Sequence, residues 1–237
     1  MPEIAAGADL AALVAGAADL RAGDVVVVAH KAVSKAEGRV RRLADVEPSP
    51  RARALGGRFD KDPRHVQVVL DEAAEVLRAE RGVIITITRH GFVCANAGVD
   101  ASNAPEEDTV VLLPKDPDRS ARALRARLHE LTGARVAAVI TDSFGRAWRH
   151  GQSDVAIGVA GIAPLEDWRG LPDSVGREMK ATWIALADEI AAAADLARGK
   201  DTREPVVVVR GLERHVTEED GPGAAALVRE RELDLFR

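Results

Sequence analysis

Four short runs rich in β-branched and other apolar residues limit the folds that this chain can adopt. They occupy residues 24–29, 83–88, 135–141 and 204–210. Runs of this length and composition are typical of strands buried in a sheet. Segments with helical spacing alternate with them, which indicates an α/β (α+β) fold. The spacing lacks the regular period of a simple Rossmann fold or barrel.

The remaining segments are assigned from their apolar spacing and from their boundary residues. Helices are predicted at residues 8–20, 65–80, 117–132 and 182–198, with Gly199 as the C-cap of the last. A short strand is predicted at residues 110–114. Residues 46–63 are rich in Pro and Arg and show no clear period, so they are expected to form a loop or a poorly packed surface connection.

Length and charge set the outer bounds on the class of protein. The 237 residues are 46% hydrophobic and 30% charged, which describes a globular chain that forms a single domain over residues 1–237, built as one unit or as two interlocked lobes. The net charge of -5 gives no support for nucleic-acid binding. No apolar run approaches the roughly 20 residues that span a bilayer, so no membrane partner is expected.

Two further features concern the cellular compartment. Cys94 is the only cysteine, so an intrachain disulfide is excluded and a reducing, cytoplasmic location is expected. The first residues lack a basic start followed by a long apolar stretch, so no signal peptide is expected. Cys94 itself is interpreted as a small apolar filler and not as a reactive thiol.

The most unusual polar segment follows the run at residues 135–141. Asp142 and Ser143 come directly after this predicted strand, at a position where open α/β sheets commonly bind ligands. A carboxylate and a hydroxyl are suitable ligands for magnesium or manganese. The alternative interpretation is that Asp142 is a capping residue. The next residues, with the acid Asp154 at their end, supply donors suited to anionic oxygens, namely Arg146, Trp148, Arg149, His150 and Gln152.

A second acid follows the run at residues 83–88. Asp100 lies beyond Gly98, and Asn103 comes three residues later, so both side chains could face one ligand in a tight turn. An Asx turn is the alternative explanation. Together with Asp142, Asp100 predicts a divalent metal site that bridges phosphate oxygens.

A basic cluster follows the run at residues 24–29. Lys31, Lys35 and Arg39 are expected to share a loop with Ser34 and to bind phosphate or carboxylate groups. A solvated basic loop is the alternative.

These segments resemble one known family, the coenzyme F-420-0:L-glutamate ligases, which attach glutamate to a deazaflavin coenzyme. The resemblance is carried by VVVVAHKAVSKAEGR at 25–39, RHGFVCANAGVDASN at 89–103, ITDSFGRAWRHGQSDVAIGVAG at 140–161, ALADEIAAAADLARGK at 185–200 and PVVVVRGL at 205–212. The matching blocks run through nearly the whole chain. The resemblance implies a two-lobed mixed-sheet fold, a homodimer, and addition of one or more γ-linked glutamates.

The resemblance also implies a reaction and its ligands. GTP phosphorylates a substrate carboxylate, and L-glutamate then displaces phosphate with release of GDP as the other product. Mn²⁺ or Mg²⁺ holds the nucleotide phosphates, and a monovalent cation is an additional ligand that the resemblance allows. The implied metal-binding residues are Asp100, Asp142 and Ser143, the last in place of the usual threonine. The implied nucleotide-binding positions are Pro2, Glu3, Ile4, His30, Lys35 and Asn103.

Some positions depart from the family pattern. His30 stands where a nucleotide-contacting serine is common, and a further strand usually precedes the motif that contains Pro2, Glu3 and Ile4. No catalytic residue is assigned, although His150 and Asp154 are candidates for a general base. A metal-dependent phosphohydrolase and a non-catalytic nucleotide-binding relative are the alternative functions.

Overall fold

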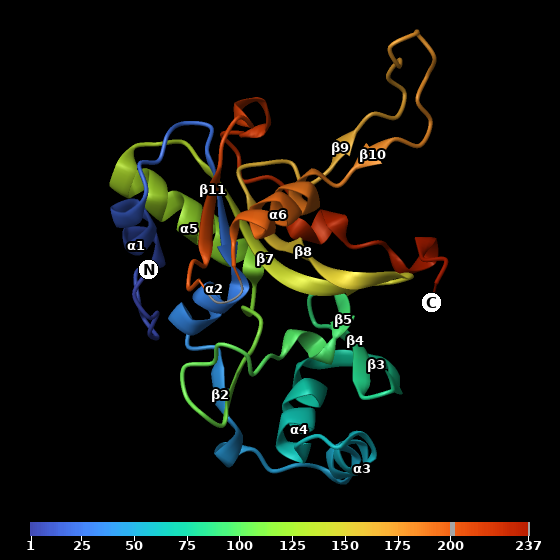
Figure 1. Cartoon of the computed structure of the whole chain (residues 1–237). Coiled ribbons are helices and arrows are strands. Elements are labelled where there is room, and N and C mark those ends of the chain that lie inside the picture. Colours follow the sequence, from blue (N-terminus) through green and yellow to red (C-terminus); the bar gives the residue numbers. More distant parts are fainter. Residues whose placement is uncertain (200–201, 237) are drawn as a thin grey trace.

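Figure 1 shows the computed structural model, which describes residues 1–199 and 202–236. The helices are α1 (Leu10–Ala17), α2 (His30–Ala36), α3 (Pro50–Phe59), α4 (Pro63–Glu72), α5 (Pro117–Thr132) and α6 (Leu186–Ala197). The strands are β1 (Val25–Ala29), β2 (Val40–Arg42), β3 (Ala73–Glu80), β4 (Val83–Thr88), β5 (Val93–Ala95), β6 (Thr109–Val111), β7 (Ala137–Arg146), β8 (Arg149–Ala160), β9 (Glu166–Asp167), β10 (Trp183–Ile184) and β11 (Val206–Val209). The elements gather mainly around a four-stranded and a three-stranded sheet, and the pairs β2–β6 and β9–β10 form two further two-stranded sheets. Helices and strands are mixed and no described sheet closes into a barrel, which confirms the predicted fold class.

The larger sheet has the strand order β11-β1-β7-β8. β1 runs parallel to β7 and antiparallel to β11, while β7 and β8 form a long antiparallel hairpin. Successive side chains of a strand point to opposite faces of its sheet. Val26 and Val28 accordingly pack in one core, and Val25 and Val27 pack in another. Strands buried on both faces read as continuous apolar runs, which is why β1 is composed of four valines and an alanine.

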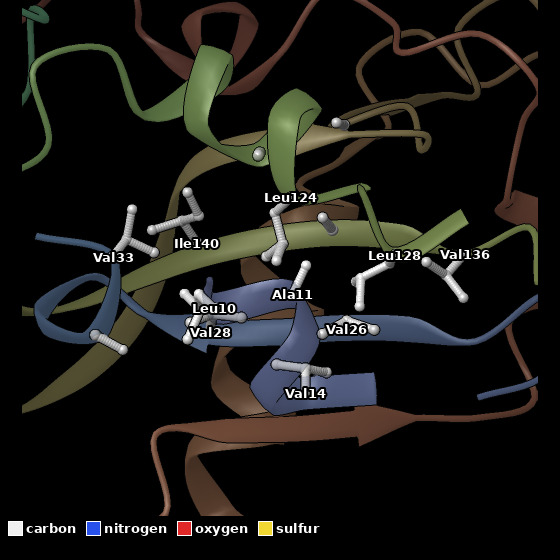
Figure 2. Close-up of a cluster of buried hydrophobic side chains, with 14 of the residues drawn as sticks. Leu10, Ala11, Val14, Val26, Val28, Val33, Leu124, Leu128, Val136 and Ile140 are labelled. Atoms are coloured by element: carbon white, nitrogen blue, oxygen red, sulfur yellow. The ribbon is translucent and has the colours of Figure 1, made fainter. Parts of the chain in front are cut away.

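Helices α1 and α5 cover one face of this sheet, as the close-up in Figure 2 shows. Leu10 and Val14 of α1 and Leu128 of α5 are buried in the same cluster as Val28 and Ile140. Burying an aliphatic side chain of this size contributes about 1.5 to 3 kcal/mol, so this layer is a main source of stability. On the opposite face, α6 packs against the sheet through its buried residues Leu186, Ala187, Ile190, Ala191 and Ala194.

The smaller sheet has the order β3-β4-β5 and its own apolar core. Val66 and Val69 of α4 are buried with Ile84 of β4 and Ala52 of α3. Strand β5 ends at Ala95, and the chain then leads through a short 3-10 turn to Asp100. This sheet therefore positions the loop that carries one of the two acids predicted to bind metal.

Strands β9 and β10 form the base of a hairpin that projects from the rest of the molecule (Figure 1). We call residues 166–184 the arm. Its side chains Leu171, Val175 and Trp183 are 47%, 73% and 52% exposed. The guanidinium of Arg169 lies 4.2 Å from the centre of the Trp183 ring, a cation–π contact that orders the base of the arm.

Two predicted helices differ from the structure because sheet pairing overrides local spacing. The helix predicted at residues 65–80 ends at Glu72, and Ala73–Glu80 forms β3, which pairs with β4. The helix predicted at residues 182–198 begins only at Leu186, because Trp183–Ile184 pairs with β9. It also ends before Gly199, since the C-cap is Arg198 in an extended conformation.

Two segments predicted as loops are helices. Residues 46–63 contain α3, whose N-cap Ser49 accepts a hydrogen bond from the amide of Ala52 and whose first residue is Pro50. The basic segment after β1 forms α2. Charged residues and glycines obscure the apolar period in α3, and lysines obscure it in α2.

The other predicted boundaries agree to within a few residues. Helix α5 has the predicted bounds, with Asp116 as its N-cap and Gly133 in a left-handed conformation at its end. Strand β7 extends past the predicted end at residue 141 as far as Arg146. The strand predicted at residues 110–114 is β6, which spans Thr109–Val111.

Candidate functional site

The register of the larger sheet brings the first predicted acid to α2. Ala29, the last residue of β1, pairs in parallel with Thr141 of β7, so the residues that follow them in the chain lie close together. These residues are His30, which begins α2, and Asp142. His30 Nε2 lies 3.3 Å from Asp142 Oδ1. The approach does not have hydrogen-bond geometry, and His30 is buried. His30 Nδ1 lies 3.3 Å from the hydroxyl of Ser34.

The second predicted acid lies beside the next residue of α2. Lys31 Nζ donates to Asp100 Oδ2 at 2.6 Å and to the Ser102 hydroxyl and carbonyl at 2.6 and 3.1 Å. Asp142 and Asp100 therefore face consecutive residues of α2, although Asp142 lies in β7 and Asp100 in the segment that follows β5. The prediction that these two acids belong to one site is consistent with this arrangement.

The charge on Asp100 is stabilised locally. Burial raises the pKa of this carboxyl, but the ammonium of Lys31 and the amide of Ser102 outweigh burial and hold the pKa below its usual value. The Ser102 amide donates to Asp100 Oδ1 at 2.7 Å, which is the Asx-type turn considered as an alternative. Asn103 follows in a left-handed conformation, with φ 55°, on the exposed side of this turn.

Lys31→Met should shift the titration of Asp100 to higher pH. The substitution removes the ammonium that opposes burial, so the carboxyl becomes easier to protonate. Carboxyl-carbon NMR titration measures this shift directly. Lys35→Met is the matched control, because Lys35 pairs with Glu3 and should leave Asp100 unchanged. An unaltered Asp100 titration in Lys31→Met would contradict the assigned ion pair.

The amino-terminal nucleotide-binding positions lie beside α2 as well. Lys35 Nζ donates to Glu3 Oε1 at 2.6 Å, and Ile4 is buried in the core below. Pro2 is exposed. Arg39, in contrast, is not part of this group, because it donates to the Leu113 carbonyl and to Glu72 at 2.9 and 2.7 Å. The three-cation phosphate cluster predicted from sequence is thus reduced to Lys31 and Lys35.

Asp142 and Ser143 lie within β7 and not beyond its end. No helix follows them, so the capping alternative for Asp142 is wrong. Asp142 Oδ1 accepts a hydrogen bond from the Ser143 amide at 2.8 Å. The Ser143 hydroxyl donates to Asp154 Oδ1 at 2.6 Å across the hairpin, where the two residues are register partners.

The other donors predicted near Asp142 lie further out on the β7–β8 hairpin. Arg146, Trp148, Arg149, His150 and Gln152 are all exposed there. Arg146 donates to the His150 carbonyl at 2.8 Å. The ring of Trp148 lies 4.8 Å from that of Phe236, so the carboxyl-terminal segment contacts the hairpin tip. These donors are not gathered around Asp142 in this structure.

Cys94 lies next to the site without taking part in it. Burial, with the negative charge of Asp142 as a second cause, raises the pKa of its thiol to about 12. A thiol with so high a pKa is a poor nucleophile at neutral pH. The interpretation of Cys94 as an unreactive, buried residue is confirmed.

The oxygen donors at this edge fit a hard divalent cation. Among the described residues, no group of three or more His, Cys, Asp and Glu side chains could hold a metal by itself. Asp100, Asp142 and Ser143 offer two carboxylates and one hydroxyl. Mg²⁺ is usually bound through one or two carboxylates together with water and substrate phosphates, so an incomplete protein set is appropriate.

Sequence reasoning missed two residues behind this edge. Thr141 donates to Asp154 Oδ2 at 2.8 Å, and the Arg198 guanidinium donates to the same oxygen. Arg198 comes from the end of α6, and no local pattern in the sequence connects it with Asp154. In the sequence, Thr141 is simply the last residue of an apolar run, and nothing there indicates its contact with Asp154.

Comparison with known proteins connects this site with a family. The model of the family described as "F420-0:Gamma-glutamyl ligase" matches residues 1–211. The chain is 50% identical over 233 residues to "Coenzyme F420:L-glutamate ligase" of Methanopyrus kandleri, covering 98% of this chain and 92% of that protein. It is 44% identical over 243 residues to the protein of the same name from Methanothermobacter thermautotrophicus, covering 100% and 96%.

These matches identify an enzyme of the ligase class. The chain belongs to the F420-0:gamma-glutamyl ligase family, as the sequence resemblance predicted. None of the helices in residues 1–199 and 202–236 is long and apolar enough to cross a membrane.

Proposed function

We propose that this chain is a coenzyme F-420-0:L-glutamate ligase that forms GDP and phosphate and acts in F-420 biosynthesis. The main support is its similarity, over nearly the full length of both chains, to relatives that carry this name. The site supports the proposal through its hard oxygen donors and its two lysines. Further γ-linked glutamates can be added by the same chemistry, because each new product ends in a carboxylate.

The first proposed step activates a carboxylate. A carboxylate oxygen of F-420-0 attacks the γ-phosphorus of GTP, the bond to the bridging oxygen breaks, and GDP leaves with the electron pair. The product is an acyl phosphate. Phosphoryl transfer depends mainly on positioning and on neutralising charge, so it needs no nucleophile from the protein. Lys31 and Lys35 lie where they can donate to anionic oxygens, and Pro2, Glu3, Ile4, His30 and Asn103 are the remaining proposed nucleotide positions.

The second proposed step forms the amide. The amine nitrogen of L-glutamate attacks the acyl carbon, the bond to phosphate breaks, and the nitrogen loses a proton to solvent. The general base remains unassigned, since His150 is exposed on the hairpin and Asp154 already accepts hydrogen bonds from two hydroxyls.

Asp100, Asp142 and Ser143 are the residues proposed to hold Mn²⁺ or Mg²⁺. Bound there, the ion would neutralise phosphate charge during phosphoryl transfer. To bind it, the two carboxylates must exchange part of their contact with Lys31 and His30 for the cation. The lysine that is released remains available for a phosphate oxygen. A monovalent cation is a further proposed ligand.

Mass spectrometry of the deazaflavin tests the proposal. Purified protein is incubated with F-420-0, GTP, Mn²⁺ and L-glutamate, and the expected result is a mass gain of one or more glutamyl units. The gain should disappear when GTP is omitted. GTP turnover that is independent of glutamate, with no mass gain, would favour a phosphohydrolase. GTP binding without turnover would favour a non-catalytic relative.

We also propose a homodimer located in the cytoplasm. The arm supports the dimer because it projects away from the rest of the chain (Figure 1) and its apolar side chains Leu171, Val175 and Trp183 are exposed. The buried single cysteine suits a reducing compartment.

Light scattering should give a mass of twice 25.2 kDa for the native chain. Leu171→Glu combined with Val175→Glu should give the monomer mass, because charges are costly inside an apolar interface. Leu196→Glu is the control, since this leucine is 91% exposed on α6, outside the arm. A native chain that elutes as a monomer, or a double variant that stays dimeric, would contradict the proposed role of the arm.

A further inference from the structure

The backbone just before Asp100 follows an unusual path. Asn96, Ala97 and Gly98 form the short turn between β5 and Asp100, and their φ angles are all positive, at 53°, 52° and 69°. Residues with a Cβ atom adopt this left-handed conformation at a cost, and usually one at a time. Asn tolerates it better than Ala, so the strain in this turn falls mainly on Ala97.

A buried threonine holds the strained residue in place. Thr86 lies in β4 and is 0% exposed. Its hydroxyl accepts a hydrogen bond from the Ala97 amide at 3.0 Å and donates to the Cys94 carbonyl at 3.3 Å. Ala97 is itself buried, and a buried amide that loses its partner is costly. The Thr86 hydroxyl therefore stabilises the residue of the turn whose conformation is least favourable.

The turn is also confined on its other side. A Cβ atom on Gly98 would lie 2.6 Å from Cγ of Leu113, which is buried. Beyond the turn, the Asp100 amide donates to the Val111 carbonyl at 3.1 Å, and the Val111 amide donates to the Asp100 carbonyl at 2.8 Å. Asp100 thus lies between the turn and β6. Because it comes only two residues after Gly98, the conformation of the turn helps to determine where its carboxylate lies.

We propose that Thr86 is a positioning residue for Asp100 and acts through the left-handed turn at residues 96–98. Its hydroxyl keeps Ala97 in a strained conformation, and this conformation places the Asp100 carboxylate for the divalent cation. Strained backbone persists where the surrounding structure holds it, and it is concentrated at functional sites. The inference rests on the metal site proposed above, and it adds a residue that affects cation affinity without touching the cation.

Thr86→Val tests this role. Valine has nearly the same shape but no hydroxyl, so the Ala97 amide loses its partner and the turn relaxes. We expect Mn²⁺ to bind about 10-fold more weakly in the presence of GTP, at the lower end of the effect of residues that support metal ligands from behind. The electron paramagnetic resonance signal of free Mn²⁺ measures this affinity. Thr86→Ser keeps the hydroxyl and should bind Mn²⁺ within about twofold of the native chain.

Thr88→Val is the matched control. Thr88 lies in the same strand and is 2% exposed, and its hydroxyl accepts from the Phe92 amide at 3.2 Å. The substitution therefore removes the same kind of hydrogen bond, but outside the turn that leads to Asp100. Its thermal unfolding should shift by an amount similar to that of Thr86→Val, whereas its Mn²⁺ affinity should stay within about twofold of the native value. Equal losses of affinity would show that any damage to β4 weakens the site, and would overturn the specific role of Thr86.

Ala97→Gly tests whether backbone strain is what the hydroxyl holds. Glycine adopts the left-handed conformation without steric cost, so the turn then depends less on Thr86. Combined with Thr86→Val, it should recover at least about threefold of the lost Mn²⁺ affinity. If Thr86→Val costs as much affinity with Ala97→Gly as without it, the proposal is overturned.

Gly98→Ala disturbs the same turn from the side of Leu113 and should also weaken Mn²⁺ binding. If Thr86→Val does not fold, native Mn²⁺ affinity in Gly98→Ala would overturn the proposal by itself. Native affinity in a folded Thr86→Val variant would overturn the role of Thr86 and leave the metal site standing. A native chain that binds GTP but no Mn²⁺ would overturn the metal site and this role together.

Discussion

Asp142→Asn is expected to lower the rate of glutamate ligation by more than about 100-fold. The change removes a negative charge from the proposed cation site while keeping the size of the side chain. Replacing even indirect supports of metal ligands costs up to about 100-fold, so the loss of a carboxylate ligand should cost at least as much. The assay is mass spectrometry of the glutamylated deazaflavin at saturating GTP and L-glutamate.

Asp19→Asn is the control for this substitution, because Asp19 is an exposed surface acid. It should leave the ligation rate unchanged. The thermal unfolding of both variants should resemble that of the native chain, since Asp142 is not part of any of the three apolar cores. Full ligation by Asp142→Asn would remove this residue from the metal site.

Gly158→Ala is expected to lower the free energy of unfolding by about 3 kcal/mol, at the upper end of the usual cost of overpacking. Gly158 lies in β8 where the strand passes under the start of α5. A Cβ atom at this position would lie 2.3 Å from the Pro117 carbonyl oxygen and 2.6 Å from its carbon. These are backbone atoms, so the helix or the strand must move. Urea unfolding measures the loss.

Gly57→Ala is the matched control. Gly57 lies in α3, and a Cβ atom there would have no neighbour within 4 Å. Alanine restricts the unfolded chain and favours a helix, so this variant should gain about 0.5 to 1 kcal/mol. Equal stability of the two variants would show that α5 does not approach β8 as closely as described.

Local signals were sufficient to predict some elements. Helix α5 was predicted with its full bounds because Pro117 marks its start and Gly133 follows its end. Strand β4 was predicted because its apolar residues stand between glycines and turns. In these segments the residues that mark the start and the end of the element lie within it or next to it in the sequence, so its bounds can be predicted locally.

Pairing between distant segments could not be predicted in this way. The apolar spacing of residues 65–80 fits one long helix, and only the ladder with β4 makes Ala73–Glu80 a strand. The polar residues 142–146 gave no sign of a strand, yet they pair with β8. Strand assignment depends there on a partner that the local sequence does not contain.

In the candidate site, too, some features could be predicted from local sequence and others depend on contacts between distant segments. Asp100 and Asp142 were predicted from their positions after apolar runs, because the ends of buried strands are common ligand sites. The contact between His30 and Asp142 follows from the parallel register of β1 and β7, which sequence alone does not specify. The role of Arg198 depends on how α6 lies against the sheet.

The burial of Cys94 has a practical consequence for site-specific fluorescence labelling of this protein. It is the only thiol in the chain, and at neutral pH it is almost fully protonated and shielded from solvent. Maleimide dyes should therefore leave the native protein unlabelled. A cysteine introduced at an exposed arm position such as Val175 would then carry a fluorophore at one defined place, without first having to remove the natural thiol.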